Sequence, residues 1–254
     1  MRRGFFFGAV ACALLFAACT THYKLTDVTR TRIVVDKTYD AVPDAQAVAF
    51  LAPYKQQVDS VMGPVVGRAA HDMVADRPES ALSNLLPDIM MWAAKQYGEQ
   101  PDFAVQNVGG IRAALSKGEV TYGDVLDVAP FDNKICFLTL TGEKVLELFR
   151  QIASRGGEGV SHGVSLVISS DSLLLSAQLN GKDIDPQASY RVTTIDYLAQ
   201  GNDQLTAFTA GTDINSPKAD SANMRFIIMD YFRAMQAQGK EVDAKVEGRV
   251  VVEK

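Results

Sequence analysis

The stretch Asn107-Val108-Gly109-Gly110-Ile111-Arg112 begins at the last residue of a short strand candidate, Asp102–Asn107. A glycine pair after a strand lets the backbone turn tightly and expose amide groups to a ligand, because glycine has no Cβ atom. Two residues later, the guanidinium of Arg112 can present a planar pair of donors to a phosphate. Taken alone, the same pattern also fits an ordinary structural turn, so its meaning depends on the surrounding sequence.

Further motifs lie on both sides of this glycine turn and follow one another at wide separations. The last two residues of one motif, Thr141 and Gly142, precede a predicted helix over Glu143–Ala153, and threonine is a good N-terminal helix cap. In chain order the motifs are Arg77-Pro78-Glu79-Ser80-Ala81-Leu82-Ser83-Asn84-Leu85, Tyr122-Gly123-Asp124-Val125, Ala129-Pro130-Phe131-Asp132-Asn133, Leu138-Thr139-Leu140-Thr141-Gly142 and Tyr197-Leu198-Ala199-Gln200-Gly201-Asn202-Asp203.

The order of these motifs closely resembles the C-terminal domain of the 5′-nucleotidase and UDP-sugar hydrolase family, over roughly Val65 to Val252. The resemblance implies a domain that recognises a nucleotide. In the family two aromatic side chains enclose the nucleobase, and the matching residues are Phe131 and Tyr197. Stacking of this kind contributes ~1–3 kcal/mol per base. The residues alone favour core positions for both rings, so the resemblance makes a distinct prediction: both rings are exposed at an open cleft.

The resemblance also implies a set of polar contacts to the substrate. Family members hold the phosphate, or line the path to it, with arginines; they contact the base with an asparagine and the ribose hydroxyls with an aspartate. The matching residues are, respectively, Arg77 and Arg112, Asn107, and Asp203, with Gly109 and Gly110 at the turn.

The loop that carries the aspartate departs from the family pattern. The family loop usually reads Asn-Gly-Gly-Asp-Gly-Phe, whereas this sequence has Gln200-Gly201-Asn202-Asp203-Gln204-Leu205. Asn202 tolerates a positive φ better than most residues, so the turn can survive that change. Gln204 stands where the family has a glycine, which leaves the direction of the Asp203 carboxylate open. Without the resemblance, Asp203 is simply a turn residue.

Histidine usage bears on catalysis. Full-length relatives carry an N-terminal metallophosphoesterase domain that holds two metal ions, which requires motifs such as Asp-x-His and Gly-Asn-His. The sequence has three histidines, His22, His71 and His162, and neither motif occurs. Gly123–Asp127 matches the string Gly-Asp-x-x-Asp, but it falls inside the C-terminal-domain pattern. We therefore expect no catalytic residue, metal ligand or cofactor in this chain, with divalent metals held only by a partner domain.

The N-terminal sequence predicts export. Arg2 and Arg3 precede an uncharged apolar run, Gly4–Ala18, that is short for a membrane span and ends before Cys19. We interpret residues 1–18 as a lipoprotein signal peptide and Cys19 as the lipidation site, with a plain secretory signal or an uncleaved anchor as alternatives. The expected location is the bacterial cell envelope, with anchoring in the outer membrane through the lipidated Cys19.

The length and the apolar fraction of the sequence are typical of a globular protein with a single large domain. The full sequence of 254 residues is 47% apolar, and cleavage after residue 18 leaves 236 residues and changes the net charge from −5 to about −7. The acidic balance argues against a nucleic-acid polymer as partner, because phosphate backbones require basic surfaces. Residues 19–44 are predicted to form a tether with an early strand at Thr31–Val35, and residues 45–254 the domain. Cys136, in an apolar stretch, is predicted to be a buried filler.

Apolar spacing predicts intermixed helices and strands without a βαβ repeat, which indicates an α+β (mixed α/β) fold of layered sheets and helices. Helices are expected over Ala45–Met62, broken at Pro53; over Ser80–Gln96, with a start that Pro87 can delay; and over Asn223–Gln238. Besides Asp102–Asn107, extended segments are expected at Thr121–Val125, Ile135–Leu140, Val164–Ile168, Ser172–Leu179, Tyr190–Thr194 and Val246–Val252, with a tight turn at Asn180–Gly181.

These observations lead to one hypothesis and two alternatives. The leading hypothesis is a split enzyme, in which this chain recognises the nucleoside part and a separately encoded metallophosphoesterase supplies the metals for nucleotide dephosphorylation. One alternative is a stand-alone nucleotide- or nucleoside-binding lipoprotein without catalysis. The other is a degenerate domain kept only for interaction. Whether the chain takes part in an enzyme is therefore left open by the sequence.

Overall fold

The computed structural model describes residues 23–34, 36–39 and 41–253, so the predicted signal peptide and Cys19 lie outside the described residues. The chain divides into two units, residues 1–50 and 51–254. Within the described ranges, no helix has the length and apolar character needed to cross a bilayer.

In the first unit, residues 23–34 form neither helix nor strand, and a short helix η1 follows at Lys37–Tyr39. The early strand predicted at Thr31–Val35 is therefore wrong for its described residues, 31–34. Their side chains are exposed and no described strand pairs with them. The physical reason is that an unpaired strand is not stable in water by itself, whatever its β-branched content.

Helix α2, Ala45–Met62, is continuous, and the predicted break at Pro53 is wrong. Asp44 precedes the helix and its Oδ1 accepts hydrogen bonds from the backbone amides of Gln46 and Ala47, at 2.8 and 3.0 Å. Proline removes one backbone donor inside a helix. No residue of α2 is buried, so water can bind the carbonyl that loses its partner.

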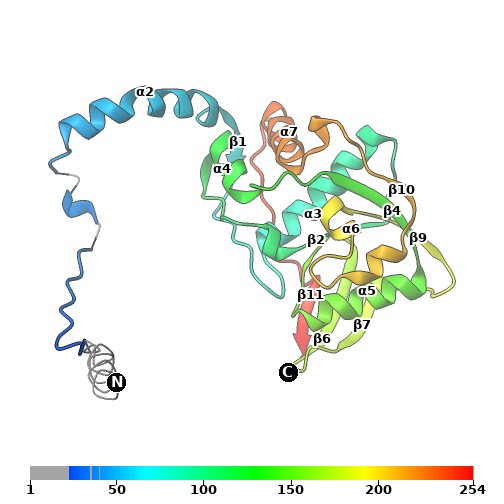
Figure 1. The fold of residues 1–254 in the computed structure, drawn as a ribbon. Coiled ribbons are helices and arrows are strands. Elements are labelled where there is room, and N and C mark those ends of the chain that lie inside the picture. Colours follow the sequence, from blue (N-terminus) through cyan, green and yellow to red (C-terminus); the bar gives the residue numbers. More distant parts are fainter. Residues whose placement is uncertain (1–22, 35, 40, 254) are drawn as a thin grey trace, which may run out of the picture. The chain divides into compact units, whose positions relative to one another are not determined.

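The second unit contains three sheets (Figure 1). The central one has five strands in the order β10-β4-β9-β2-β5, and a four-stranded sheet has the order β11-β6-β7-β8. Strands β1 and β3 form a separate antiparallel pair. The strands are β1 Val65–Ala69, β2 Phe103–Gln106, β3 Gly118–Thr121, β4 Ile135–Thr141, β5 Gly159–Val160, β6 Val164–Ser169, β7 Leu174–Leu179, β8 Lys182–Asp183, β9 Ser189–Ile195, β10 Thr212–Asn215 and β11 Val250–Glu253. The predicted α+β fold is confirmed.

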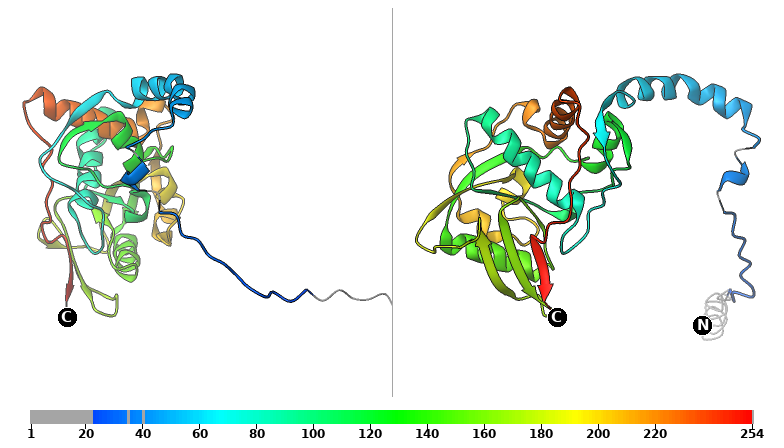
Figure 2. Two further views of the ribbon diagram at one scale, coloured as in Figure 1. Left: turned by 90° about the vertical axis from the view of Figure 1, so that its left-hand side faces the viewer. Right: turned by 180° about the vertical axis from the view of Figure 1, so that it is seen from behind.

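Helices cover both faces of the central sheet. Phe103 of β2 contacts Phe149 of helix α5, Gly142–Ser154, with ring centroids 5.4 Å apart. Phe137 of β4 contacts the ring of Tyr97, which follows helix α3, Ala81–Ala94, at 5.8 Å. The strand register places Phe137 on the face opposite to Phe103, because successive side chains alternate along a strand. The buried core therefore lies between α5, the sheet and α3, and Figure 2 shows these elements from two further sides.

Helix α3 begins at Ala81 with Ser80 as its N-cap, near the start of the predicted helix Ser80–Gln96, and not after Pro87. The Ser80 side chain accepts a hydrogen bond from the Ser83 amide, and the Ser83 side chain accepts one from the Ser80 amide, which makes a capping box. Pro87 cannot donate to the Ser83 carbonyl. Gly159 of β5 packs so close to that oxygen that a Cβ atom would lie 2.4 Å from it. The capping box thus starts the helix upstream of the proline.

The extended segment predicted at Thr121–Val125 is wrong beyond its first residue. Thr121 ends β3 and caps helix α4, Tyr122–Val128, through a hydrogen bond that its side chain accepts from the Asp124 amide. Helix α7, Met224–Ala237, starts at Asn223 as predicted, and Gly239 after it has a φ of 69°. The predicted Asn180–Gly181 turn connects β7 and β8, with φ values of 52° and 73°.

Candidate functional site

An open cleft lies at one edge of the central sheet. Strands β2 and β9 run parallel, and β4 runs antiparallel to β9, so the C-terminal ends of the first two strands and the N-terminal end of β4 meet there. The cleft encloses about 740 Å³, including space open to solvent. Its lining residues are Arg77, Asn107, Gly109, Gly110, Phe131, Asn133, Arg155, Tyr197 and Asp203. Seven of the eight substrate-binding residues predicted from the sequence are therefore brought together.

Both predicted aromatic rings are exposed at this cleft. Phe131 is 48% exposed and Tyr197 is 37% exposed, which rules out the core positions that the residues alone favoured. Phe131 lies in the loop before β4, and Tyr197 lies in the short helix α6, Asp196–Ala199. The structure thus meets the condition that the resemblance set for base-stacking residues. Their contact with a base remains a prediction.

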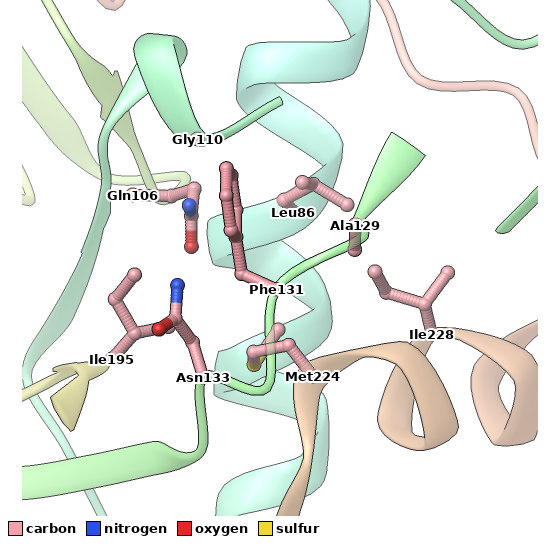
Figure 3. Close-up of a pocket in the computed structure, with 9 residues that line it drawn as sticks. All are labelled: Leu86, Gln106, Gly110, Ala129, Phe131, Asn133, Ile195, Met224 and Ile228. Carbon is pink, nitrogen blue, oxygen red and sulfur yellow. The ribbon is translucent and has the colours of Figure 1, made fainter. Parts of the chain in front are cut away.

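Phe131 stands between the cleft and a smaller recess behind it (Figure 3). On one side of the ring lie the amide groups of Gln106 and Asn133, and on the other lie Leu86 and Ala129. Met224 and Ile228 from α7 close the recess on the apolar side. The ring is therefore supported by apolar side chains while its loop leaves it partly open to solvent.

A buried carboxylate organises two arginines at the cleft. The side chain of Glu158 is 0% exposed, and its Oε1 accepts hydrogen bonds from Arg77 Nη2 at 2.5 Å and Arg155 Nε at 2.6 Å. Its Oε2 accepts one from the Val108 amide, at 2.6 Å, in the glycine turn. Arg77 Nε also donates to the Gly157 carbonyl, at 2.8 Å. A buried charge needs such partners, so Glu158 fixes both guanidiniums relative to the turn.

Arg112 does not line the cleft among the described residues. Its Nη1 donates to the carbonyl of Gly109, at 3.1 Å, and its side chain is exposed. The expectation that Arg77 and Arg112 both line one cleft is thus met only by Arg77. The reason is local: the Arg112 side chain folds back onto the turn that precedes it. Arg155, from the end of α5, occupies the second arginine position instead.

Asp203 lies at the cleft despite the altered loop. Its Oδ1 accepts a hydrogen bond from Tyr197 Oη at 3.0 Å, and its Oδ2 accepts one from Asn107 Nδ2 at 2.7 Å. Arg155 Nη2 lies 3.6 Å from the same Oδ2. The hydrogen bond to the Asp203 carboxylate raises the pKa of Tyr197. Asp203 and Gln204 have φ values of 54° and 62°, so both non-glycine residues adopt the left-handed conformation.

Three site residues, Asn133, Arg155 and Glu158, were not predicted from the sequence. Asn133 is the last residue of the Ala129–Asn133 motif, two residues after Phe131, and its position was the available signal. Arg155 and Glu158 flank the pair Gly156–Gly157, whose φ values are 77° and 110°. A glycine pair next to an arginine is the same weak signal that drew attention to the Gly109–Gly110 turn.

Other potentially reactive groups lie outside the cleft. Cys136 is buried in β4, and burial raises the pKa of its thiol, as expected of a filler. His162 is exposed, and its Nδ1 lies 2.9 Å from Glu247 Oε2. Within residues 23–34, 36–39 and 41–253, no three His, Cys, Asp or Glu side chains gather as a metal site requires. The residues present there do not fit a two-metal centre.

An α+β domain with two exposed rings, two fixed arginines and a carboxylate at one sheet edge has the form of a small-ligand recognition domain. The family model of the 5′-nucleotidase C-terminal domain matches residues 65–210, and the chain belongs to this family.

Curated relatives and solved structures agree with this assignment. The chain is 28% identical over 170 residues to "Protein UshA" of Yersinia enterocolitica, covering 65% of this chain and 31% of that protein. It is 26% identical over 239 residues to "Cell wall protein Lmo0130" of Listeria monocytogenes, covering 84% of this chain and 30% of the relative. The crystal structure of a 5′-nucleotidase precursor from Thermus thermophilus matches with a TM-score of 0.70 and 28% identity, covering 84% of this chain and 44% of that one. The chain thus spans about a third of the curated relatives.

Proposed function

We propose that this chain recognises the nucleoside part of a nucleotide and acts in nucleotide dephosphorylation together with a separately encoded metallophosphoesterase. One observation carries the recognition role. Seven motif residues, drawn from segments as far apart as Arg77 and Asp203, line one open cleft in a chain of the 5′-nucleotidase C-terminal-domain family. Unrelated surface residues have no structural reason to meet in this way.

Each part of the cleft has a task in this proposal. Phe131 and Tyr197 stack on the base, and Asp203 accepts hydrogen bonds from the ribose hydroxyls. A guanidinium has five N–H donors, and Glu158 and Gly157 accept from only two nitrogens of Arg77. Donors therefore remain for a phosphate group, as charge-assisted hydrogen bonds. The site binds and orients the substrate, and the reaction takes place at the metal centre of the partner.

The proposal of a separate catalytic chain rests on the division of labour in the family. The sequence contains neither Asp-x-His nor Gly-Asn-His, and its family match is to a C-terminal domain. Two metal ions on the partner would supply the hydroxide nucleophile and stabilise the leaving oxygen. The residues of this chain hold the nucleoside while that happens.

We also propose that the chain is exported and anchored through lipids on Cys19 in the outer membrane of the cell envelope. The support is the charged start, apolar run and cysteine of the N-terminal sequence. The name of the Listeria relative places that protein at the cell wall. A Cys19→Ala variant should move from the membrane fraction to the soluble fraction; an unchanged distribution would contradict lipid anchoring.

The recognition role is tested by calorimetric titration of the purified chain with adenosine, AMP and UDP-glucose. Phe131→Ala should weaken nucleoside affinity by roughly tenfold or more, since it removes one stacking partner. Leu173→Ala, which shortens an exposed side chain outside the cleft, is the matched control and should change nothing. Equal affinities of wild type and Phe131→Ala would reject the cleft.

The partner is tested by searching the neighbouring genes for an exported metallophosphoesterase, mixing that protein with this chain and measuring phosphate release from AMP. The rate should exceed that of the partner alone, and the Phe131→Ala chain should not support the increase. Tight nucleoside binding without any rate increase would favour the stand-alone binding role instead.

A further inference from the structure

Tyr197 carries a polar contact that its stacking role does not need. Its Oη donates to Asp203 Oδ1 at 3.0 Å, six residues along the same loop. A phenyl ring would stack on a base equally well, so stacking does not explain the hydroxyl. The hydroxyl instead restricts the orientation of the Asp203 carboxylate, because a hydrogen bond between two side chains limits the rotation of both.

The second carboxylate oxygen of Asp203 is held from the opposite side. Asn107 Nδ2 donates to Oδ2 at 2.7 Å, and Gln106 Nε2 donates to Asn107 Oδ1 at 3.0 Å. Gln106 and Asn107 are 5% and 3% exposed, so this part of the chain of hydrogen bonds is rigidly packed. Figure 3 shows the Gln106 amide beside the ring of Phe131. The chain of hydrogen bonds thus starts next to one aromatic residue and ends at the hydroxyl of the other.

The loop after Tyr197 has an unfavourable backbone conformation that the hydroxyl can help to stabilise. Asp203 and Gln204 both have positive φ, a conformation that is unfavourable for a residue with a Cβ atom. Asn202 Nδ2 donates to the Tyr197 carbonyl at 2.8 Å, which closes the loop from its other end. Side-chain hydrogen bonds therefore hold a backbone shape that glycine would adopt without help.

We propose that the Tyr197 hydroxyl is a positioning group that fixes the Asp203 carboxylate for the 2′,3′-diol of ribose, and so makes the cleft selective for ribonucleosides. This inference rests on the proposed function. A carboxylate offers about four lone-pair directions. Tyr197 and Asn107 each use one direction on a different oxygen. Arg155 Nη2 lies 3.6 Å from Oδ2, which is too far for a hydrogen bond, so one acceptor direction remains on each oxygen. Two adjacent hydroxyl donors match this arrangement, and a sugar without them does not.

The test compares adenosine with 2′,3′-dideoxyadenosine by calorimetric titration of the wild-type protein and Tyr197→Phe. Loss of the positioning bond should weaken adenosine binding by roughly five- to tenfold. Binding of the dideoxynucleoside should change by less than about twofold, because the stacking ring is retained. In the Asp203→Asn background, Tyr197→Phe should cause no further loss. Tyr97→Phe, which removes a hydroxyl that donates to the Ser221 carbonyl outside the cleft, is the matched control.

Two outcomes overturn the inference: unchanged adenosine affinity in Tyr197→Phe, or equal weakening of both nucleosides. A second measurement tests the contact without any ligand. The raised pKa of Tyr197, followed by ultraviolet absorbance at high pH, should fall back toward its ordinary value in Asp203→Asn. If the wild-type protein binds neither nucleoside, the proposed function fails and the ribose role fails with it. A raised pKa that Asp203→Asn abolishes would then show that the contact itself exists.

Discussion

At the residue scale, Glu158 determines where two guanidiniums lie. Its carboxylate is fully buried, and Arg77, Arg155 and the Val108 amide all donate to it. These donors come from the loop before α3, the end of α5 and the glycine turn, so one side chain ties three segments together. A change at Glu158 should therefore affect both stability and the part of the cleft that we propose binds a phosphate.

We predict that Glu158→Gln lowers the free energy of unfolding by about 1–3 kcal/mol, because buried donors lose a charged acceptor. The same variant should weaken binding of AMP more than binding of adenosine, since the arginines lose their alignment. Urea unfolding and calorimetric titration measure the two effects. Glu119→Gln is the control: Glu119 pairs with Arg68 at 3.6 Å on the surface, where such pairs contribute little. Equal loss for AMP and adenosine would show that Glu158 acts only on the fold.

Sequence motifs predicted most of the cleft but not its internal supports. Phe131 and Tyr197 were found because their motifs match a family, although ring residues taken alone favour a core. Glu158 was not found, because a buried acid is recognised by its partners, and two of the three, the Val108 amide and Arg77, are 50 and 81 residues away in the sequence. The orientation of the Arg112 side chain was not predictable either, since this long, flexible side chain can reach either the cleft or the carbonyl of Gly109 in its own turn.

At the scale of the elements, a paired arginine holds strand β9 to the segment before β2. Arg191 donates from Nη2 and Nε to the two carboxylate oxygens of Glu99, at 2.7 and 2.8 Å. Both side chains are mostly buried, at 16% and 13% exposure. The hydrogen bond from Arg191 is the main reason that the pKa of Glu99 lies below its ordinary value of 4.5. This two-point contact lies near the start of β2, away from the edge that carries the cleft.

The lowered pKa of Glu99 predicts how stability depends on pH. The folded state binds a proton at Glu99 less readily than the unfolded state, so the pair stabilises the fold fully above about pH 4.5. This contribution is lost as the pH falls through the lowered value. Glu99→Gln should therefore be less stable at pH 7 and lose less stability on acidification, as urea unfolding at pH 7 and pH 3.5 can show. Asp59→Asn, in an exposed pair with Lys55, should behave as the wild type; the same pH dependence in Glu99→Gln would contradict the assignment.

Local pattern predicted most strands and helices, and it failed where capping overrides composition. Thr121–Val125 has β-branched ends, yet the Thr121 and Asp124 cap starts a helix there. Pro87 suggested a late helix start, yet Ser80 begins α3 seven residues earlier. In each case a specific side-chain hydrogen bond decided the outcome, and single-residue preferences do not contain that information.

At the scale of the whole molecule, the chain belongs to the family of 5′-nucleotidase C-terminal domains, and its match to the Yersinia relative covers 31% of that protein. We predict that the purified protein releases no phosphate from AMP in the presence of Mg²⁺, Mn²⁺ or Zn²⁺. Two-metal hydrolysis needs several histidine and aspartate ligands in fixed motifs. Activity that a chelator removes and that survives further purification steps would refute this prediction.

The parallel pairing of β2 with β9 also sets an order of events during synthesis. Asn107 and Asp203 meet in the cleft although they are 96 residues apart, and the strands behind them cannot pair until both have left the ribosome. Long-range parallel pairing is a slow step because a long loop must close first. After the glycine turn has been synthesised, the cleft therefore stays incomplete until the next 96 residues, more than a third of the polypeptide, have also been made. Nucleoside binding by nascent chains of increasing length would mark the moment at which the central sheet closes.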